Sequence, residues 1–132
     1  MADMEVYFPG GKRVNADYKG FTIETDQPVS GGGEGAAPAP FDLFLASIGT
    51  CAGIYALGFM QKRSIDTADS KIIMRTHHNS EIGVIDKVEI ELRTPPGFPD
   101  KYRRAIINAM ELCAVKKHMH QPPVFEVTTV SG

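Results

Sequence analysis

Apolar and polar residues alternate in several short runs, and this pattern predicts β-strands. The clearest run is 84–93, where Val88, Ile90 and Leu92 are separated by charged residues, as in a strand with one solvent-facing side. A turn at Lys19-Gly20 predicts a hairpin between two earlier runs. The remaining strands are expected at residues 4–8, 13–18, 21–26, 69–77 and 124–130.

One long segment has no charge at all. No charged residue occurs from Leu43 to Met60, and the segment predicts a helix from near Pro40 to near Arg63. Proline is tolerated in the first turn of a helix, and the carboxylate of Asp42 suits the positive end of the helix dipole. The polar, glycine-rich stretch before it, residues 27–40, is expected to be a loop.

A second helix is expected from Asp100 to about Val115, because Ile106, Met110 and Cys113 recur there at helical spacing. The predicted order is three strands, a helix, two strands, a helix and a strand. Such segregated strands and helices favour an α+β fold. The length of 132 residues predicts a single domain over residues 1–132.

The uncharged run just reaches the length of a membrane span. However, Gly49, Gly53 and Gly58 interrupt it, and Asp42 and Lys62 close it tightly. A helix that is apolar on all sides is also typical of the buried centre of a protein or oligomer. We therefore expect no membrane partner. The acidic start of the chain lacks the features of a signal peptide, which predicts a cytoplasmic protein.

Charge and cysteine content argue against two classes of protein, nucleic-acid-binding proteins and disulfide-rich secreted proteins. The chain has 14 Lys and Arg against 16 Asp and Glu, for a net charge of −2, so nothing points to a nucleic-acid partner. Two cysteines are too few for a secreted disulfide framework. In a reducing compartment such cysteines are either buried core residues or reactive thiols.

The two cysteines, Cys51 and Cys113, each fall within a predicted helix. If the helices pack together, the sulfurs could meet, but free cysteine is also among the most buried residue types. Gly49 and Gly53 share a helix face with four-residue spacing, which indicates that something approaches the backbone. Both a second helix and a substrate reaching the thiol fit this pattern. The residues alone leave a redox pair and two structural cysteines open.

A metal site is a further interpretation, using Cys113 with His118 and His120. No spacing in the chain fixes such a site. The two histidines fit equally well as exposed residues at a helix end, where positive charge is favoured.

The segment from Pro40 to Cys51, PFDLFLASIGTC, resembles the helix motif of the OsmC/Ohr superfamily, the osmotically inducible and organic hydroperoxide resistance proteins. Cys113-Ala114-Val115 is similar to the second cysteine motif of that family. The residues Asp26-Gln27-Pro28, the glycine loop and Ala37-Pro38 resemble its YhfA-type branch. The resemblance covers nearly the whole chain.

This resemblance implies an intertwined homodimer with an OsmC-like α+β fold, in which two central helices are flanked by antiparallel sheets. It also implies a thiol-dependent peroxidase for organic hydroperoxides. By the same analogy Cys51 is the peroxidatic cysteine, which attacks the peroxide, and Cys113 is the resolving one. No metal, haem or flavin cofactor is needed, but turnover requires an external dithiol such as a lipoyl group or a thioredoxin-like protein.

The family activates its thiolate with an arginine that an acid holds in place. Arg13 is the best candidate for the arginine, and Lys12 is the fallback. The supporting acid is Asp42, by analogy with the YhfA-like branch, or Glu34 in the glycine loop. A phenylalanine, Phe41, stands where the organic hydroperoxide branch has a glutamate. That departure leaves open an alternative function, a non-catalytic small-molecule binding module with structural cysteines.

Overall fold

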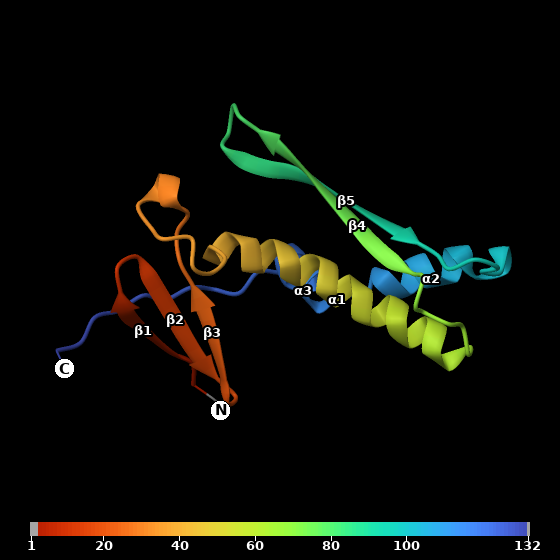
Figure 1. Ribbon diagram of the computed structural model, residues 1–132, viewed down its shortest axis with the longest axis horizontal. Helices are drawn as coiled ribbons and strands as arrows, with labels where there is room; N and C mark the ends of the chain where they lie inside the picture. The colour runs from red at the N-terminus through yellow and green to blue at the C-terminus, as the bar shows by residue number, and fades with distance from the viewer. Residues whose placement is uncertain (1–2, 132) are drawn as a thin grey trace. The chain divides into compact units, whose positions relative to one another are not determined.

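The computed structural model describes residues 3–131, and the chain folds as two compact units. The first unit ends at Ala46 and the second begins at Ser47. The long helix α1 (Pro40–Lys62) begins in the first unit and continues into the second (Figure 1). Strands and helices are segregated along the chain, so the α+β class expected from the sequence is confirmed.

The first unit contains a three-stranded antiparallel sheet in the order β1-β2-β3. Lys19 and Gly20 connect its second hairpin and both have positive φ, as the tight turns that suit twisted strands require. The predicted hairpin is therefore confirmed, with small differences at the strand ends. The strands are β1 (Glu5–Gly10), β2 (Arg13–Tyr18) and β3 (Phe21–Thr25).

The glycine-rich segment after β3 is an ordered loop that includes a short 3₁₀ turn, η1 (Val29–Gly31). The loop returns to its start, because the Asp26 N–H donates to the Pro38 carbonyl at 3.2 Å. Helix α1 then begins at Pro40. The Asp42 carboxylate accepts a hydrogen bond from the Ala39 N–H at 3.2 Å and so caps the first turn.

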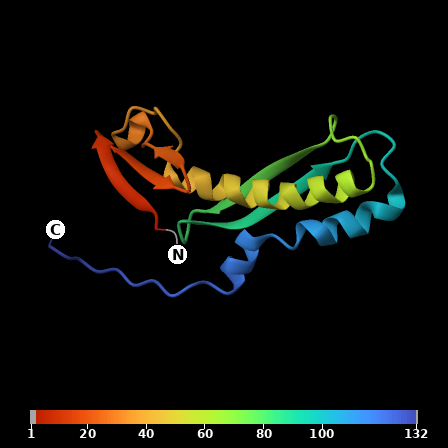
Figure 2. The same cartoon turned by 90° about the horizontal axis from the view of Figure 1, so that it is seen from below.

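In the second unit, an antiparallel hairpin formed by β4 (Lys71–Asn79) and β5 (Val84–Arg93) lies along α1 (Figure 2). Two of the helix glycines, Gly49 and Gly53, face this hairpin. A Cβ added at Gly49 would lie 3.1 Å from the Met74 sulfur, and one at Gly53 would lie 3.5 Å from Ile72 Cδ1. The close neighbour expected from the glycine spacing is therefore a strand of the hairpin.

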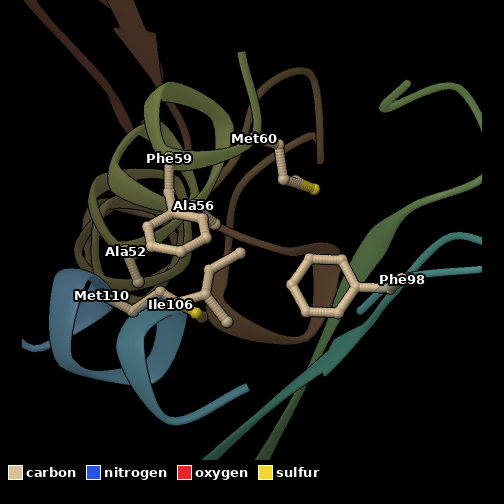
Figure 3. Packing of buried hydrophobic residues seen from close by; sticks show 7 residues of the cluster. All are labelled: Ala52, Ala56, Phe59, Met60, Phe98, Ile106 and Met110. Atoms are coloured by element: carbon tan, nitrogen blue, oxygen red, sulfur yellow. The ribbon is translucent and has the colours of Figure 1, made fainter. Parts of the chain in front are cut away.

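The apolar core of the second unit joins α1, α2 (Arg103–Met110) and the loop after β5. Figure 3 shows their side chains pointing toward one another. Ile106 of α2, predicted to face the core, is almost fully buried at 1% exposure. The cluster consists of Ala52, Ala56, Phe59, Met60, Phe98, Ile106 and Met110.

The second predicted helix is not continuous, and this expectation was wrong in its extent. The chain forms a 3₁₀ turn η2 (Asp100–Tyr102), then α2, and a separate helix α3 (Ala114–His120). Cys113 has a non-helical backbone conformation, with ψ at 123°, and is the N-cap residue of α3.

The last predicted strand was also wrong. Residues 122–131 have no strand assignment, and the apolar side chains among them are almost fully exposed. The alternating pattern indicates strand propensity, but a strand forms only when a neighbouring strand supplies hydrogen bonds. Within the described part of this chain, no strand pairs with the segment.

Helix α1 is long and apolar enough, by length and composition, to cross a membrane, and it is the one such helix among the described residues. The core helix of a soluble protein satisfies the same two criteria.

Candidate functional site

The second unit brings the two cysteines together. Cys51 lies in the middle of α1 and Cys113 at the start of α3, and each side chain interacts with the other. Both are free thiols. The pairing expected between two packed helices is therefore present, although Cys113 is contributed by a break between helices rather than by a helix face.

The surroundings of Cys51 favour its thiolate. Hydrogen bonds from the Val115 backbone N–H and from the Cys113 thiol lower the pKa of Cys51 below its usual value, with a smaller contribution from the Ala114 N–H. These donors outweigh the opposing effect of partial burial. The Cys51 side chain is only partly covered, so it combines a stabilised anion with access from outside.

Cys113 has the opposite character. It is completely buried, and this burial raises the pKa of its thiol, because a thiolate is poorly solvated there. The nearby Cys51 raises it further. Of the two thiols, Cys51 therefore loses its proton more readily and Cys113 holds its proton more tightly, which is the division of roles that a nucleophile and a resolving thiol require.

The backbone groups of Ala114 and Val115 were not identified as functional from the sequence. Any residue except proline supplies a backbone N–H, so no side-chain signal marks these positions. The non-helical conformation of Cys113 directs the chain so that the N–H groups of the first turn of α3 face Cys51.

In the first unit, Arg13 forms an ion pair with Glu34 of the glycine loop, with Nη2 and Oε2 at 3.4 Å. Of the two acids considered from the sequence, Glu34 is therefore the one that contacts Arg13. Asp42, the other, binds the Ala39 N–H at the start of α1. Lys12 lies beside Gly32 of the same loop, where an added Cβ would be 3.6 Å from Lys12 Cε.

The histidines considered as metal ligands lie in the last turn of α3 and are exposed. His118 Nδ1 lies 2.7 Å from the Ala114 carbonyl, a contact within its own helix. Residues 3–131 contain no group of three or more His, Cys, Asp or Glu side chains able to hold a metal ion. The metal interpretation thus has no donor set in the described residues.

An apolar cavity of about 340 Å³ lies beside the cysteine-bearing stretch of α1, between β5 and α2. Ala52, the neighbour of Cys51 in sequence, forms part of its wall, and Arg103 and Lys116 supply cationic groups. Such a cavity suits a small molecule with an apolar body. Its apolar wall includes Ile90, Leu92, Ile106, Ile107 and Met110.

Solved structures share this fold over most of both chains. One is a Psychrobacter arcticus 273-4 protein described as an osmotic stress induced and detoxification response protein; it has a TM-score of 0.74 at 24% identity, covering 89% of this chain and 87% of that one. An organic hydroperoxide resistance protein OsmC from Legionella pneumophila has a TM-score of 0.58 at 18% identity, and the match covers 90% of this chain and 88% of that one. The organic hydroperoxide resistance protein OhrB of Bacillus subtilis has a TM-score of 0.52 at 19% identity, and the match covers 89% of this chain and 90% of that one.

The comparison with curated proteins gives no significant match. The family model for OsmC-like proteins, in contrast, matches residues 31–128. This range contains both cysteines, the long helix α1 and the hairpin of the second unit. It is about three quarters of the sequence, and the chain belongs to the OsmC-like protein family.

Proposed function

We propose that this protein is a thiol-dependent peroxidase that reduces organic hydroperoxides, and so has an antioxidant role in oxidative stress. One observation carries the proposal. Cys51, partly accessible and with a lowered pKa, lies in contact with the buried, protonated Cys113. The membership in a family whose solved members include organic hydroperoxide resistance proteins supports a redox or peroxide-resistance role.

The proposed reaction begins at the Cys51 thiolate. Its sulfur attacks the terminal oxygen of the hydroperoxide, the O–O bond breaks, and the alkoxide takes a proton to leave as an alcohol. Cys51 is then a sulfenic acid. The Cys113 thiol condenses with it, one water leaves, and a Cys51–Cys113 disulfide remains.

Turnover requires a reductant from outside the chain. The disulfide accepts two electrons from an external dithiol, such as a lipoyl group or a thioredoxin-like protein, and both thiols are restored. No metal, haem or flavin takes part in the proposal. A reducing compartment keeps the thiols ready for the next cycle, so we place the protein in the cytoplasm.

Arg13 is the cation we assign to the activation of the Cys51 thiolate. A guanidinium keeps its charge at every physiological pH and presents a flat fork of donors to an anion. Glu34 holds this guanidinium in the first unit, and this contact supports Glu34 over Asp42 as the acid of the pair.

We also propose that the protein is a homodimer. Much of α1 is apolar yet uncovered: Ile54, in the middle of the helix, is 59% exposed. The extended segment 122–131 likewise exposes Val124, Phe125, Val127 and Val130. Exposed apolar side chains on this scale indicate an association site, and a second copy would cover them.

Two variants test the reaction. Cys51→Ser is expected to lose consumption of cumene hydroperoxide in the presence of dihydrolipoamide, because the nucleophile is gone. Cys113→Ser is expected to keep the first step and to accumulate a Cys51 sulfenic acid, which dimedone traps. Full peroxide consumption by Cys51→Ser would refute the proposal.

The apolar cavity favours a second candidate, a non-catalytic binding module on the same fold. In that case the cysteines are structural and the cavity of about 340 Å³ holds an apolar small molecule. The two functions differ in one cheap observation. A binding module leaves cumene hydroperoxide and both thiols unchanged over many minutes, whereas the peroxidase consumes them.

A further inference from the structure

The glycine loop of the first unit is built around a buried carboxylate, Asp26. The side chain is 1% exposed, although it follows a strand whose residues are mostly exposed. Its two oxygens accept backbone N–H groups from three loop residues: Gln27 at 2.7 Å, Ala36 at 3.1 Å and Glu34 at 3.3 Å. Hydrogen bonds from Ala36 and Gln27 lower the pKa of Asp26, so the group is charged at neutral pH.

The loop closes tightly over this carboxylate. The Asp26 N–H binds the Pro38 carbonyl, and the Gly35 N–H binds the Gln27 carbonyl at 3.0 Å. A Cβ added at Gly33 would lie 2.1 Å from the Gln27 oxygen and 2.7 Å from Asp26 Oδ1. The backbone therefore passes so close to Asp26 that no side chain fits at position 33.

Glu34 follows Gly33 directly, and its own N–H is one of the three bound to Asp26. Its side chain reaches the turn between β1 and β2, where it pairs with Arg13. A Cβ at Gly11 in that turn would be 3.7 Å from Glu34 Oε1, so the carboxylate lies against the turn backbone as well.

The Arg13–Glu34 pair is exposed on both sides, and exposed ion pairs contribute little to stability on their own. Much of their cost is the entropy of holding two long side chains in one geometry. Fixing the Glu34 backbone removes part of that cost. The negative charge of Asp26 also acts on Arg13 directly, since the two groups interact electrostatically.

We infer that Asp26 is a positioning residue for Arg13. Its buried carboxylate fixes the backbone at Glu34, and Glu34 holds the guanidinium, the group to which we assign the activation of Cys51. Asp26 itself contacts neither the thiol nor the peroxide. The inference rests on the proposed function only in its last step, because Asp26, Glu34 and Arg13 all belong to the first unit.

The test compares Asp26→Asn, Glu34→Gln and the double variant. The matched control is Asp17→Asn, an exposed carboxylate in the same sheet that accepts hydrogen bonds from Thr22 and Tyr7. Two readouts are taken on each protein. NMR relaxation of the Arg13 Nε–H group reports how ordered the side chain is, and the pH profile of Cys51 alkylation reports its activation.

Asp26→Asn and Glu34→Gln are each expected to disorder Arg13 and to slow alkylation of Cys51 at neutral pH by about fivefold or more. The double variant is expected to be no slower than either single one, because both act through the same contact. The alkylation profile should move to higher pH in all three. Asp17→Asn is expected to match the wild type in both readouts.

Additive losses in the double variant, or an Arg13 side chain as ordered in Asp26→Asn as in the wild type, would overturn the inference. If Asp26→Asn does not fold, Gly33→Ala displaces the same loop while leaving the carboxylate intact, and it must disorder Arg13. A wild-type protein that leaves hydroperoxide unchanged refutes the proposed function instead. The NMR comparison still decides in that case whether Asp26 orders Arg13.

Discussion

Cys51 and Cys113 are chemically the same residue, and their surroundings alone give them different roles. Backbone and thiol donors lower the pKa of Cys51, whereas complete burial raises the pKa of Cys113. At neutral pH the first is the better nucleophile, and the second retains the proton that it must lose when the disulfide closes. The asymmetry needs no cofactor and is created within a single unit of the fold.

Removing the Cys113 thiol tests one of these donors. In Cys113→Ala we expect the pKa of Cys51 to rise, since a hydrogen bond to the thiolate is lost while the Val115 N–H remains. Alkylation of Cys51 by iodoacetamide at pH 7 should slow severalfold, about tenfold for each unit of pKa. Cys113→Ser keeps a donor and should stay closer to the wild type. A pKa of Cys51 that is unchanged or lower in Cys113→Ala, measured from the pH dependence of its alkylation, contradicts this interpretation.

The backbone contribution can be isolated at the start of α3. Proline at position 114 removes one N–H near Cys51, and the ψ of 123° at Cys113 suits a residue before proline. We expect Ala114→Pro to raise the pKa of Cys51 by less than Cys113→Ala does, because the Ala114 contribution is the smaller one. Ala114→Ser keeps the N–H and is the control. Identical pH profiles for the two variants would argue against the backbone as a source of activation.

At the scale of elements, the glycine loop shows how closely a backbone can pack when one residue lacks a side chain. Gly33→Ala is expected to destabilise the protein by about 1–3 kcal/mol, because its Cβ would meet a carbonyl oxygen that cannot move freely. Gly31→Ala is the control, since its Cβ would make ordinary contacts at 3.6 Å and its φ is not positive. Urea denaturation measures both. Equal stabilities of the two variants would mean that the loop is not fixed around Asp26.

Much of the fold could be predicted from local patterns. β2 has the predicted bounds, β5 does as well, and α1 begins at the predicted Pro40. Each of these elements has a strong local signal: alternation over several residues, or a long apolar run after a proline. The contact between Cys51 and Cys113 could also be predicted, because the family resemblance implied this pair.

Other features depend on contacts that no local pattern contains. The break at Cys113 interrupts a sequence with good helical spacing, because the bonding of Ala114 and Val115 to Cys51 competes with helix continuation. The 124–130 segment has an alternating pattern but no strand partner among the described residues. Arg13 was the candidate cation that the family resemblance implied, but its contact with Glu34 rather than Asp42 depends on the folded loop around Asp26.

For the whole molecule, the exposed apolar surface of α1 and of the C-terminal segment is the feature that a single chain does not explain. Ile54→Glu is expected to prevent dimer formation, because the free energy needed to bury an unpaired charge exceeds what the apolar contact contributes to association. Sedimentation should give twice the 14.4 kDa chain mass for the wild type and the single mass for the variant. Val29→Glu, at an exposed loop residue of the first unit, should remain dimeric. A wild type that sediments as a single chain would contradict the dimer.

The central claim is that Cys51 and Cys113 form a peroxide-reducing pair, and a single-turnover thiol count tests it most directly. Fully reduced protein is mixed without oxygen with one equivalent of cumene hydroperoxide, and separately with hydrogen peroxide, and mass spectrometry follows both cysteines over seconds. The account predicts rapid loss of two thiols, a Cys51–Cys113 disulfide, and a faster reaction with the organic peroxide. Two thiols that persist for many minutes would contradict it and would make the cysteines structural.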